Sequence, residues 1–236
     1  DGKKAQGDIN SLKSSLGGLG SAFKSVLGAN LVSGALMSGI SALTGGVKSA
    51  FSSAIDEGAK LQQSIGGIET LFKDSAGTVK QYANEAFRTA GVSANEYMEN
   101  VTSFSASLIS SLGGDTAKAA ELANTAMTDM SDNANKMGSD MKLITQTYQS
   151  LARGNYAMLD NLKLGYGGTK AEMQRLIKDA ASYKDVQEEL NMTVNEGDLS
   201  FANMVKAISV VQKKLGITGT TAKEAAETFS GSFASM

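Results

Sequence analysis

The sequence predicts an all-α fold, in which a long amphipathic N-terminal helix precedes a multi-helix region. Three observations predict it. Apolar residues recur along most of the chain at spacings of three or four, which is the helical period. The 236 residues include no Pro, the residue that breaks helix interiors. No run alternates apolar and polar residues with the period of two that is typical of a half-buried strand.

The composition narrows the classes of function. The chain contains no His and no Cys, which excludes a Ser-His-Asp triad, a Cys nucleophile, a thiolate zinc site and a disulfide framework. Only carboxylate, Lys or Tyr chemistry remains, so we expect no enzyme, no metal site and no cofactor. The formal net charge is −2, whereas nucleic-acid binding needs a basic chain or patch. Residues 1–50 nevertheless carry five Lys and two Asp, a local excess of +3.

Residues 1–65 are expected to form the N-terminal helical segment. Within it, apolar residues alternate at spacings of three and four, which favours a coiled-coil seam between copies of the chain. Packing of the same stripe inside its own domain is the alternative, because interrupting glycines each cost a helix roughly 1 kcal/mol. The stripe comprises Ile9, Leu12, Leu16, Leu19, Phe23 and Val26, and its first five members are the candidate oligomer interface.

A stretch rich in Gly and Ser follows at residues 25–47, between two lysines, and carries no formal charge. Its length is enough to span a bilayer core of about 30 Å. Small residues recur at every fourth position, which lets helix backbones approach closely in water or in lipid. We favour a helix-packing face in water over a membrane segment, with later membrane insertion as the open alternative. The stripe comprises Gly34, Ser38, Ala42 and Gly46.

Residues 66–236 are expected to form a multi-helix region, because glycines divide the helical patterns into blocks. The first expected helices cover 69–90, 94–112 and 116–137, and a shorter one follows. Ser, Thr and Asp accept hydrogen bonds at helix starts, whereas Gly suits helix ends. The expected caps of these helices are Gly91, Ser93, Asp115, Ser139 and Gly154.

A Gly-rich turn at residues 165–168 precedes a capping box at Thr169–Glu172. The turn lacks the spacing of a phosphate-binding loop. We interpret it as a tight turn before a capped helix, where an anion can still rest on the helix end. Further along, Asp198 is expected to cap a helix that reaches Leu215, and a capping box at Thr221 is expected to open the last helix.

Acidic and amide residues gather between positions 129 and 140. An EF-hand loop needs Gly at its sixth position and Glu at its twelfth, and this run has neither. We therefore expect a solvated helix face rather than a calcium site. Methionines in the same region recur at near-helical spacing and predict an adaptable core. The polar residues are Asp129, Asp132, Asn133, Asn135 and Asp140, and the methionines are Met127, Met130, Met137 and Met141.

Three runs in this region carry a family likeness: Ala126–Gly138, Tyr148–Asn155 and Met158–Thr169. Together they resemble the core region of tape measure proteins of long-tailed bacteriophages and related tail-like particles. The likeness covers roughly residues 66–230. It implies a mostly helical structural protein, packed as a few copies in the tail tube, whose length sets the length of the tail. It also implies release ahead of the DNA during genome ejection, to help cross the host envelope.

The resemblance further implies the partners and the location. The partners are other copies of the chain, with three the expected number, together with tail tube proteins, tail-tip or baseplate proteins and, during ejection, the host membrane. The location is the virion, in the tail lumen or tip. Because 236 helical residues span only about 350 Å and tape measure proteins are several times longer, we expect the chain to be one section. The rival hypothesis is a self-contained helical effector that forms pores or is translocated.

The coiled-coil interpretation predicts the effect of Leu16→Asp. If the apolar stripe is an oligomer seam, a buried carboxylate in it should dissociate the assembly into monomers. Light scattering at several protein concentrations measures the stoichiometry. If the stripe packs inside one chain, the substitution should instead unfold the helix at an unchanged stoichiometry.

Overall fold

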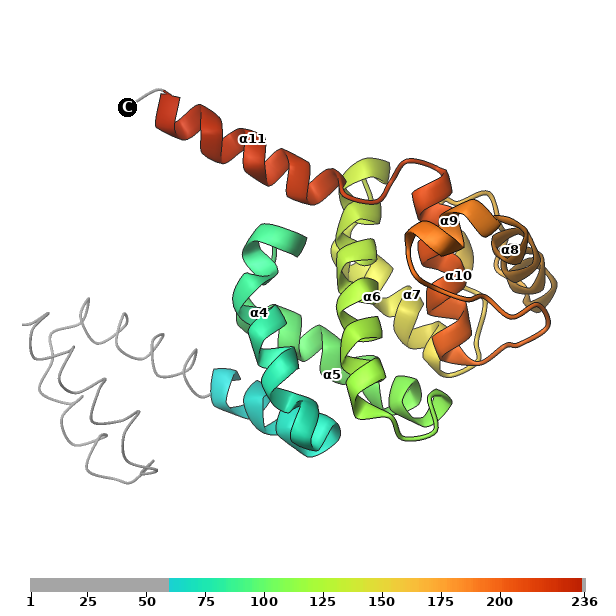
Figure 1. Cartoon of the computed structure of the whole chain (residues 1–236), viewed down its shortest axis with the longest axis horizontal. Helices are drawn as coiled ribbons and strands as arrows, with labels where there is room; N and C mark the ends of the chain where they lie inside the picture. Colours follow the sequence, from blue (N-terminus) through green and yellow to red (C-terminus); the bar gives the residue numbers. More distant parts are fainter. Residues whose placement is uncertain (1–59, 235–236) are drawn as a thin grey trace, which may run out of the picture. The chain divides into compact units, whose positions relative to one another are not determined.

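The computed structural model describes residues 60–234, with side chains up to residue 227. These residues belong to one compact unit. The described residues are helical and contain no strand (Figure 1), which confirms the predicted all-α class. The expected long N-terminal helix lies outside them. So do the proposed seam and the small-residue stripe, at Ile9, Leu12, Leu16, Leu19, Phe23, Gly34, Ser38, Ala42 and Gly46.

The helices follow one another with short connections. Residues 60–72 are helical, including residues 60–65, which the sequence assigned to the N-terminal segment. Two 3₁₀ helices are η1 (Lys73–Ser75) and η2 (Leu159–Leu162). The α-helices are α4 (Ala76–Ala90), α5 (Ala94–Ser111), α6 (Thr116–Met137), α7 (Met141–Ala152), α8 (Lys170–Ser182), α9 (Lys184–Glu189), α10 (Phe201–Lys214) and α11 (Thr220–Ala234).

Several helix boundaries lie where the capping residues predicted them. The Ser93 hydroxyl accepts a hydrogen bond from the Glu96 amide, and the Asp115 side chain accepts one from the Lys118 amide. Gly91 takes a left-handed conformation with φ 63° after α4, which glycine adopts without the steric penalty of a Cβ. The two N-caps, Ser93 and Asp115, satisfy amides that have no partner inside their own helix.

Two predicted N-caps are wrong by one or two residues. Asp140, not Ser139, caps α7, because its carboxylate accepts from two backbone amides of the first turn. Ser200, not Asp198, caps α10. Asp198 instead accepts hydrogen bonds from both the backbone amide and the hydroxyl of Ser200. The acidic residue thus holds the capping serine in place.

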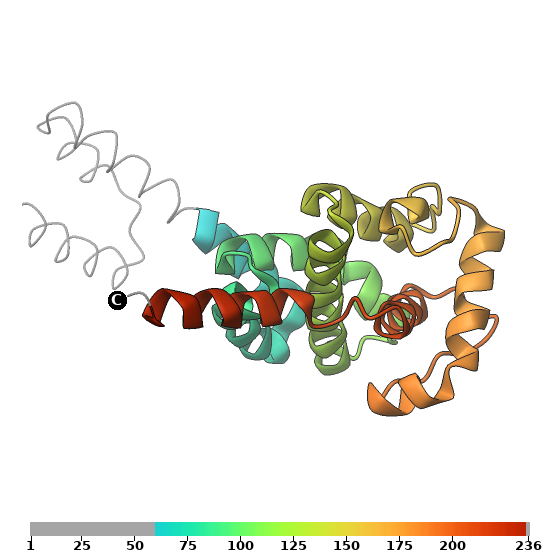
Figure 2. The same cartoon turned by 90° about the horizontal axis from the view of Figure 1, so that it is seen from above.

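Helix α6 lies at the centre of the described unit. It contacts α4, α5, α7, α10 and α11, and Figure 1 shows it between the α4–α5 pair and the α7–α10 side. Helix α10 packs against α6 on one side and against α8 on the other, as the view in Figure 2 shows. An edge-to-face contact of Phe104 on α5 with Phe201 on α10, at 6.0 Å between ring centroids, joins the two sides of this core.

Helix α6 and the start of α7 carry the methionines that the sequence assigned to an adaptable core. Met127 and Met130 are fully buried, and Met137 and Met141 are partly buried against the same cluster.

Among the described residues, none of the helices has the length and apolar character needed to cross a membrane.

Candidate functional site

The C-terminal half of α6 buries four polar side chains, here called the α6 polar cluster: Asp129, Ser131, Asp132 and Asn133. Their residues are at most 7% exposed, and Asp132 is not exposed at all. The predicted solvated helix face is therefore wrong for Asp129, Asp132 and Asn133. The physical reason is that neighbouring elements surround this part of α6, and buried polar groups persist where they find hydrogen-bond partners.

The α6 polar cluster hydrogen-bonds to segments distant in the sequence. The Ser131 hydroxyl donates to the carbonyl of Ala90 at the end of α4, at 2.6 Å. The Asn133 side-chain amide donates to the carbonyl of Leu162 in η2, at 2.9 Å. These two contacts tie α4 and η2 to the same turns of α6.

Asp132 caps the last helix from outside that helix. Its carboxylate accepts hydrogen bonds from the backbone amides of Gly219, at 2.6 Å, and Thr221, at 2.8 Å. The Thr220 hydroxyl donates to the Asp132 backbone carbonyl at 3.3 Å. A negative charge at a helix N-terminus also interacts favourably with the helix dipole. The predicted role of Thr221 as N-cap is thus wrong, because a residue nearly ninety positions earlier supplies the cap.

Asp129 has a different environment. Burial of its carboxyl group, which disfavours the charged form, raises its pKa to about 8; a hydrogen bond with Ser209 opposes this rise, and the nearby Asp132 adds to it. Its Oδ2 atom has no hydrogen-bond partner, and neither does the hydroxyl of Tyr148. Burial, followed by the proximity of Asp129, raises the pKa of Tyr148 well above its usual value.

The Gly-rich turn is stabilised by its own neighbours. A Cβ at Gly168 would collide with the carbonyl oxygen of Ala157, so the turn requires glycine there. The Glu172 carboxylate accepts a hydrogen bond from the Gly167 amide at 3.0 Å and pairs with Arg175 at 2.7 Å. The hydrogen bond from Arg175 lowers the Glu172 pKa to about 2. The turn thus finds its hydrogen-bond partner within the chain, and these contacts favour the tight-turn interpretation.

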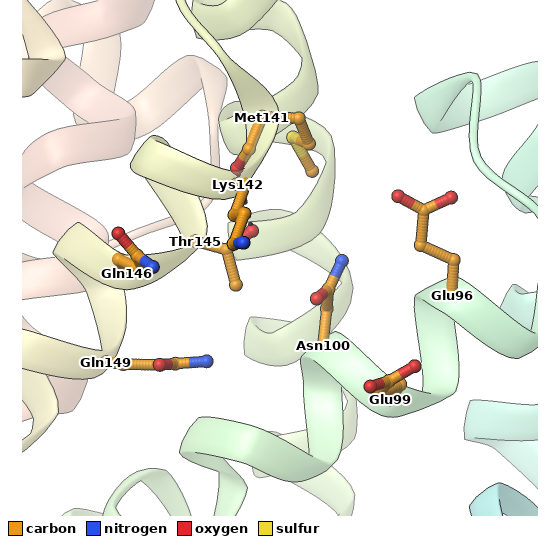
Figure 3. A pocket seen from close by; sticks show the side chains of 8 residues that line it. All are labelled: Glu96, Glu99, Asn100, Met141, Lys142, Thr145, Gln146 and Gln149. Carbon is orange, nitrogen blue, oxygen red and sulfur yellow. Dashed lines mark hydrogen bonds between the residues drawn. The ribbon is translucent and has the colours of Figure 1, made fainter.

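A shallow groove of about 360 Å³ lies between α5 and α7. Figure 3 shows side chains of both helices around it, with Glu96, Glu99 and Asn100 on the α5 side. Lys142, Thr145, Gln146 and Gln149 are among the residues on the α7 side. The groove offers hydrogen-bond donors and acceptors to a polar partner, but its charges are of both signs.

Among residues 60–234, no group of carboxylates is arranged to hold a metal ion. Comparisons with protein-family models, curated proteins and solved structures found no match to this chain. The distinguishing property of the α6 polar cluster is that its four residues join separate elements to one helix. The partners lie in α4, η2, α11 and, through the Asp129 backbone carbonyl, α10.

No local sequence signal revealed the buried cluster. The buried Ala119, Ala120, Ala123, Ala126 and Met127 recur at spacings of three and four, so they lie on one face of α6. This pattern predicts an amphipathic helix, with exposed residues such as Lys118 and Glu121 on the other side. The burial of Asp129 and Asp132 depends instead on α10 and on the start of α11, which are distant in the sequence.

Loss of the Asp132 carboxylate should loosen α11. In Asp132→Ala the amides of Gly219 and Thr221 lose their acceptor, and loss of an N-cap costs about 1–2 kcal/mol. We expect cleavage by trypsin after the exposed Lys223 to accelerate roughly 5- to 30-fold. Mass spectrometry of samples taken during the digest measures the rate of cleavage after Lys223.

Asp160→Ala is the matched control, because it removes the same kind of side chain from an exposed position. It should leave cleavage after Lys223 unchanged. Equal cleavage rates for Asp132→Ala and the unmodified chain would show that the cap does not hold α11.

Proposed function

We propose that this chain is one section of a phage tail tape measure protein, a non-catalytic structural protein that sets tail length. It acts through contacts with other copies of itself and with tail tube and tail-tip proteins. It leaves the tail ahead of the DNA during ejection and helps to cross the host envelope. The proposal rests on the three runs that carry the family likeness, 126–138, 148–155 and 158–169.

The observation that supports it most is that these three runs meet in the folded chain. The Asn133 side chain of the first run bonds to the Leu162 carbonyl of the third. The Lys163 ammonium of the third run donates to the Met137 carbonyl of the first, at 3.0 Å. The first and third runs therefore belong to one structural unit, which agrees with a likeness that extends over a single region of the chain.

The contacts within the second run strengthen this point. The Ser150 hydroxyl donates to the Asn155 carbonyl at 2.9 Å, and this closes the turn after α7. Just before this run, Thr147 donates to the Met158 carbonyl at the start of the third run, at 3.2 Å. The likeness therefore follows residues that fix the path of the chain from α6 to α8.

The physical properties of the chain agree with the proposed role. The described residues form helices without a disulfide, since the chain has no Cys, so no covalent link prevents this region from being drawn out. Fully helical, 236 residues would measure about 350 Å. The proposal thus requires an extended form of this sequence in the tail, besides the compact form of the described region.

The decisive experiment is the mass and stoichiometry of the native assembly, by intact mass spectrometry and light scattering of purified particles. The proposal predicts a parent chain several times longer than 236 residues, present in a few copies in each tail-like particle. A free protein of about 24.4 kDa without any particle would contradict it. That result would favour the rival, a self-contained helical effector, and lipid binding by residues 25–47 would then be tested.

A further inference from the structure

Three buried oxygen atoms without hydrogen-bond partners lie on three helices that pack together. They are Oδ2 of Asp129 on α6, the hydroxyl of Tyr148 on α7 and Oε1 of Gln212 on α10. The three residues are at most 2% exposed. The Gln212 amide group donates to the backbone carbonyl of Asp129 at 3.3 Å, which places these two residues side by side.

The hydrogen-bonding capacity of this cluster depends on one proton. A carboxylate and a side-chain carbonyl only accept hydrogen bonds, and a tyrosine hydroxyl donates a single hydrogen. An ionised Asp129 would therefore leave an excess of acceptors in a site that water does not reach. A protonated Asp129 supplies one more donor and removes the charge.

The charges around Asp129 do not compensate an ionised form. Within the described residues, the ion pairs of Lys and Arg side chains involve other carboxylates. On its own helix Asp129 faces Asp132, which has the same sign, and on α7 it faces Tyr148. From α10 it meets Ser209 and Gln212, which are uncharged. A buried charge without a partner is strongly unfavourable.

We propose that the contact of α6 with α7 and α10 is a proton-dependent lock: the compact unit forms around a neutral Asp129 carboxyl group, and ionisation of that group loosens the contact. The shifted pKa of about 8 agrees with this geometry, since burial is its largest cause. The inference does not depend on the proposed tape measure function.

The direction of the pH effect follows from the two states. In the unfolded chain an Asp titrates near its ordinary pKa of about 4. Between about pH 4 and pH 8 the folded unit therefore binds one proton that the unfolded chain has released. Stability must fall as the pH rises through this window, and the loss is complete above the folded pKa. Unfolding at neutral pH releases a proton.

The test compares the unmodified chain with Asp129→Asn, which keeps the shape of the neutral acid and cannot ionise. Urea unfolding is followed at several pH values between about 5 and 7. Relative to Asp129→Asn, the unfolding equilibrium constant of the unmodified chain should rise about tenfold for each pH unit. Asp160→Asn, at an exposed position, should follow the unmodified chain. Parallel pH profiles for the unmodified chain and Asp129→Asn would overturn the proposal.

A second measurement needs no variant and decides the question if Asp129→Asn does not fold. The carboxyl carbon resonance of Asp129 is titrated by nuclear magnetic resonance in the unmodified chain, with Asp160 as the internal comparison. The proposal predicts an Asp129 midpoint near pH 8 and loosened packing of α10 above it. A midpoint near 4, the ordinary value of an aspartate, would overturn the proposal.

Discussion

Burial on every side of α6 at residues 129–133 is the constraint on which the rest of the described structure depends. Five consecutive residues there are buried among the helices that α6 contacts, whereas Lys118, Glu121 and Lys136, nearer its ends, are exposed. The apolar positions of α6 are mostly Ala and Met, which allow neighbouring helices to approach and adapt. The polar residues that remain, in the α6 polar cluster, must pair with groups of those neighbours or stay neutral.

The α6 polar cluster meets this constraint in two ways. Ser131, Asp132 and Asn133 supply hydrogen bonds that the ends of other elements lack, at the end of α4, the start of α11 and in η2. Such contacts add little net stability one by one, but each is costly to break because it would leave a buried group without a partner. In contrast, the Oδ2 atom of Asp129 has no hydrogen-bond partner. One helix therefore contains both side chains that hydrogen-bond to other elements and a buried carboxyl group with an oxygen that lacks a partner.

The local parts of this structure were predictable from the sequence and the long-range parts were not. Ser93, Asp115 and Gly91 act on neighbouring residues, so their patterns predicted the helix boundaries that the structure confirms. The cap of α11 comes from Asp132, and no local pattern around Thr221 could show a partner so distant in sequence. The prediction for the acidic run at 129–140 is wrong for the same reason. The run lacks the residues of an EF-hand loop, which argues against a calcium site, but only the packing around α6 shows that Asp129, Asp132 and Asn133 are buried.

The same contacts connect the fold to the proposed role. The segments on which the proposed tape measure role rests converge on α6 and on the turn after α7, so the proposal and the architecture concern the same residues. Native-state hydrogen exchange tests most directly whether α6 organises the unit. The account predicts that amides at 126–133 exchange only through global unfolding, whereas amides of α11 exchange earlier through local opening. Exchange of the α6 amides as fast as those of α11 would contradict it.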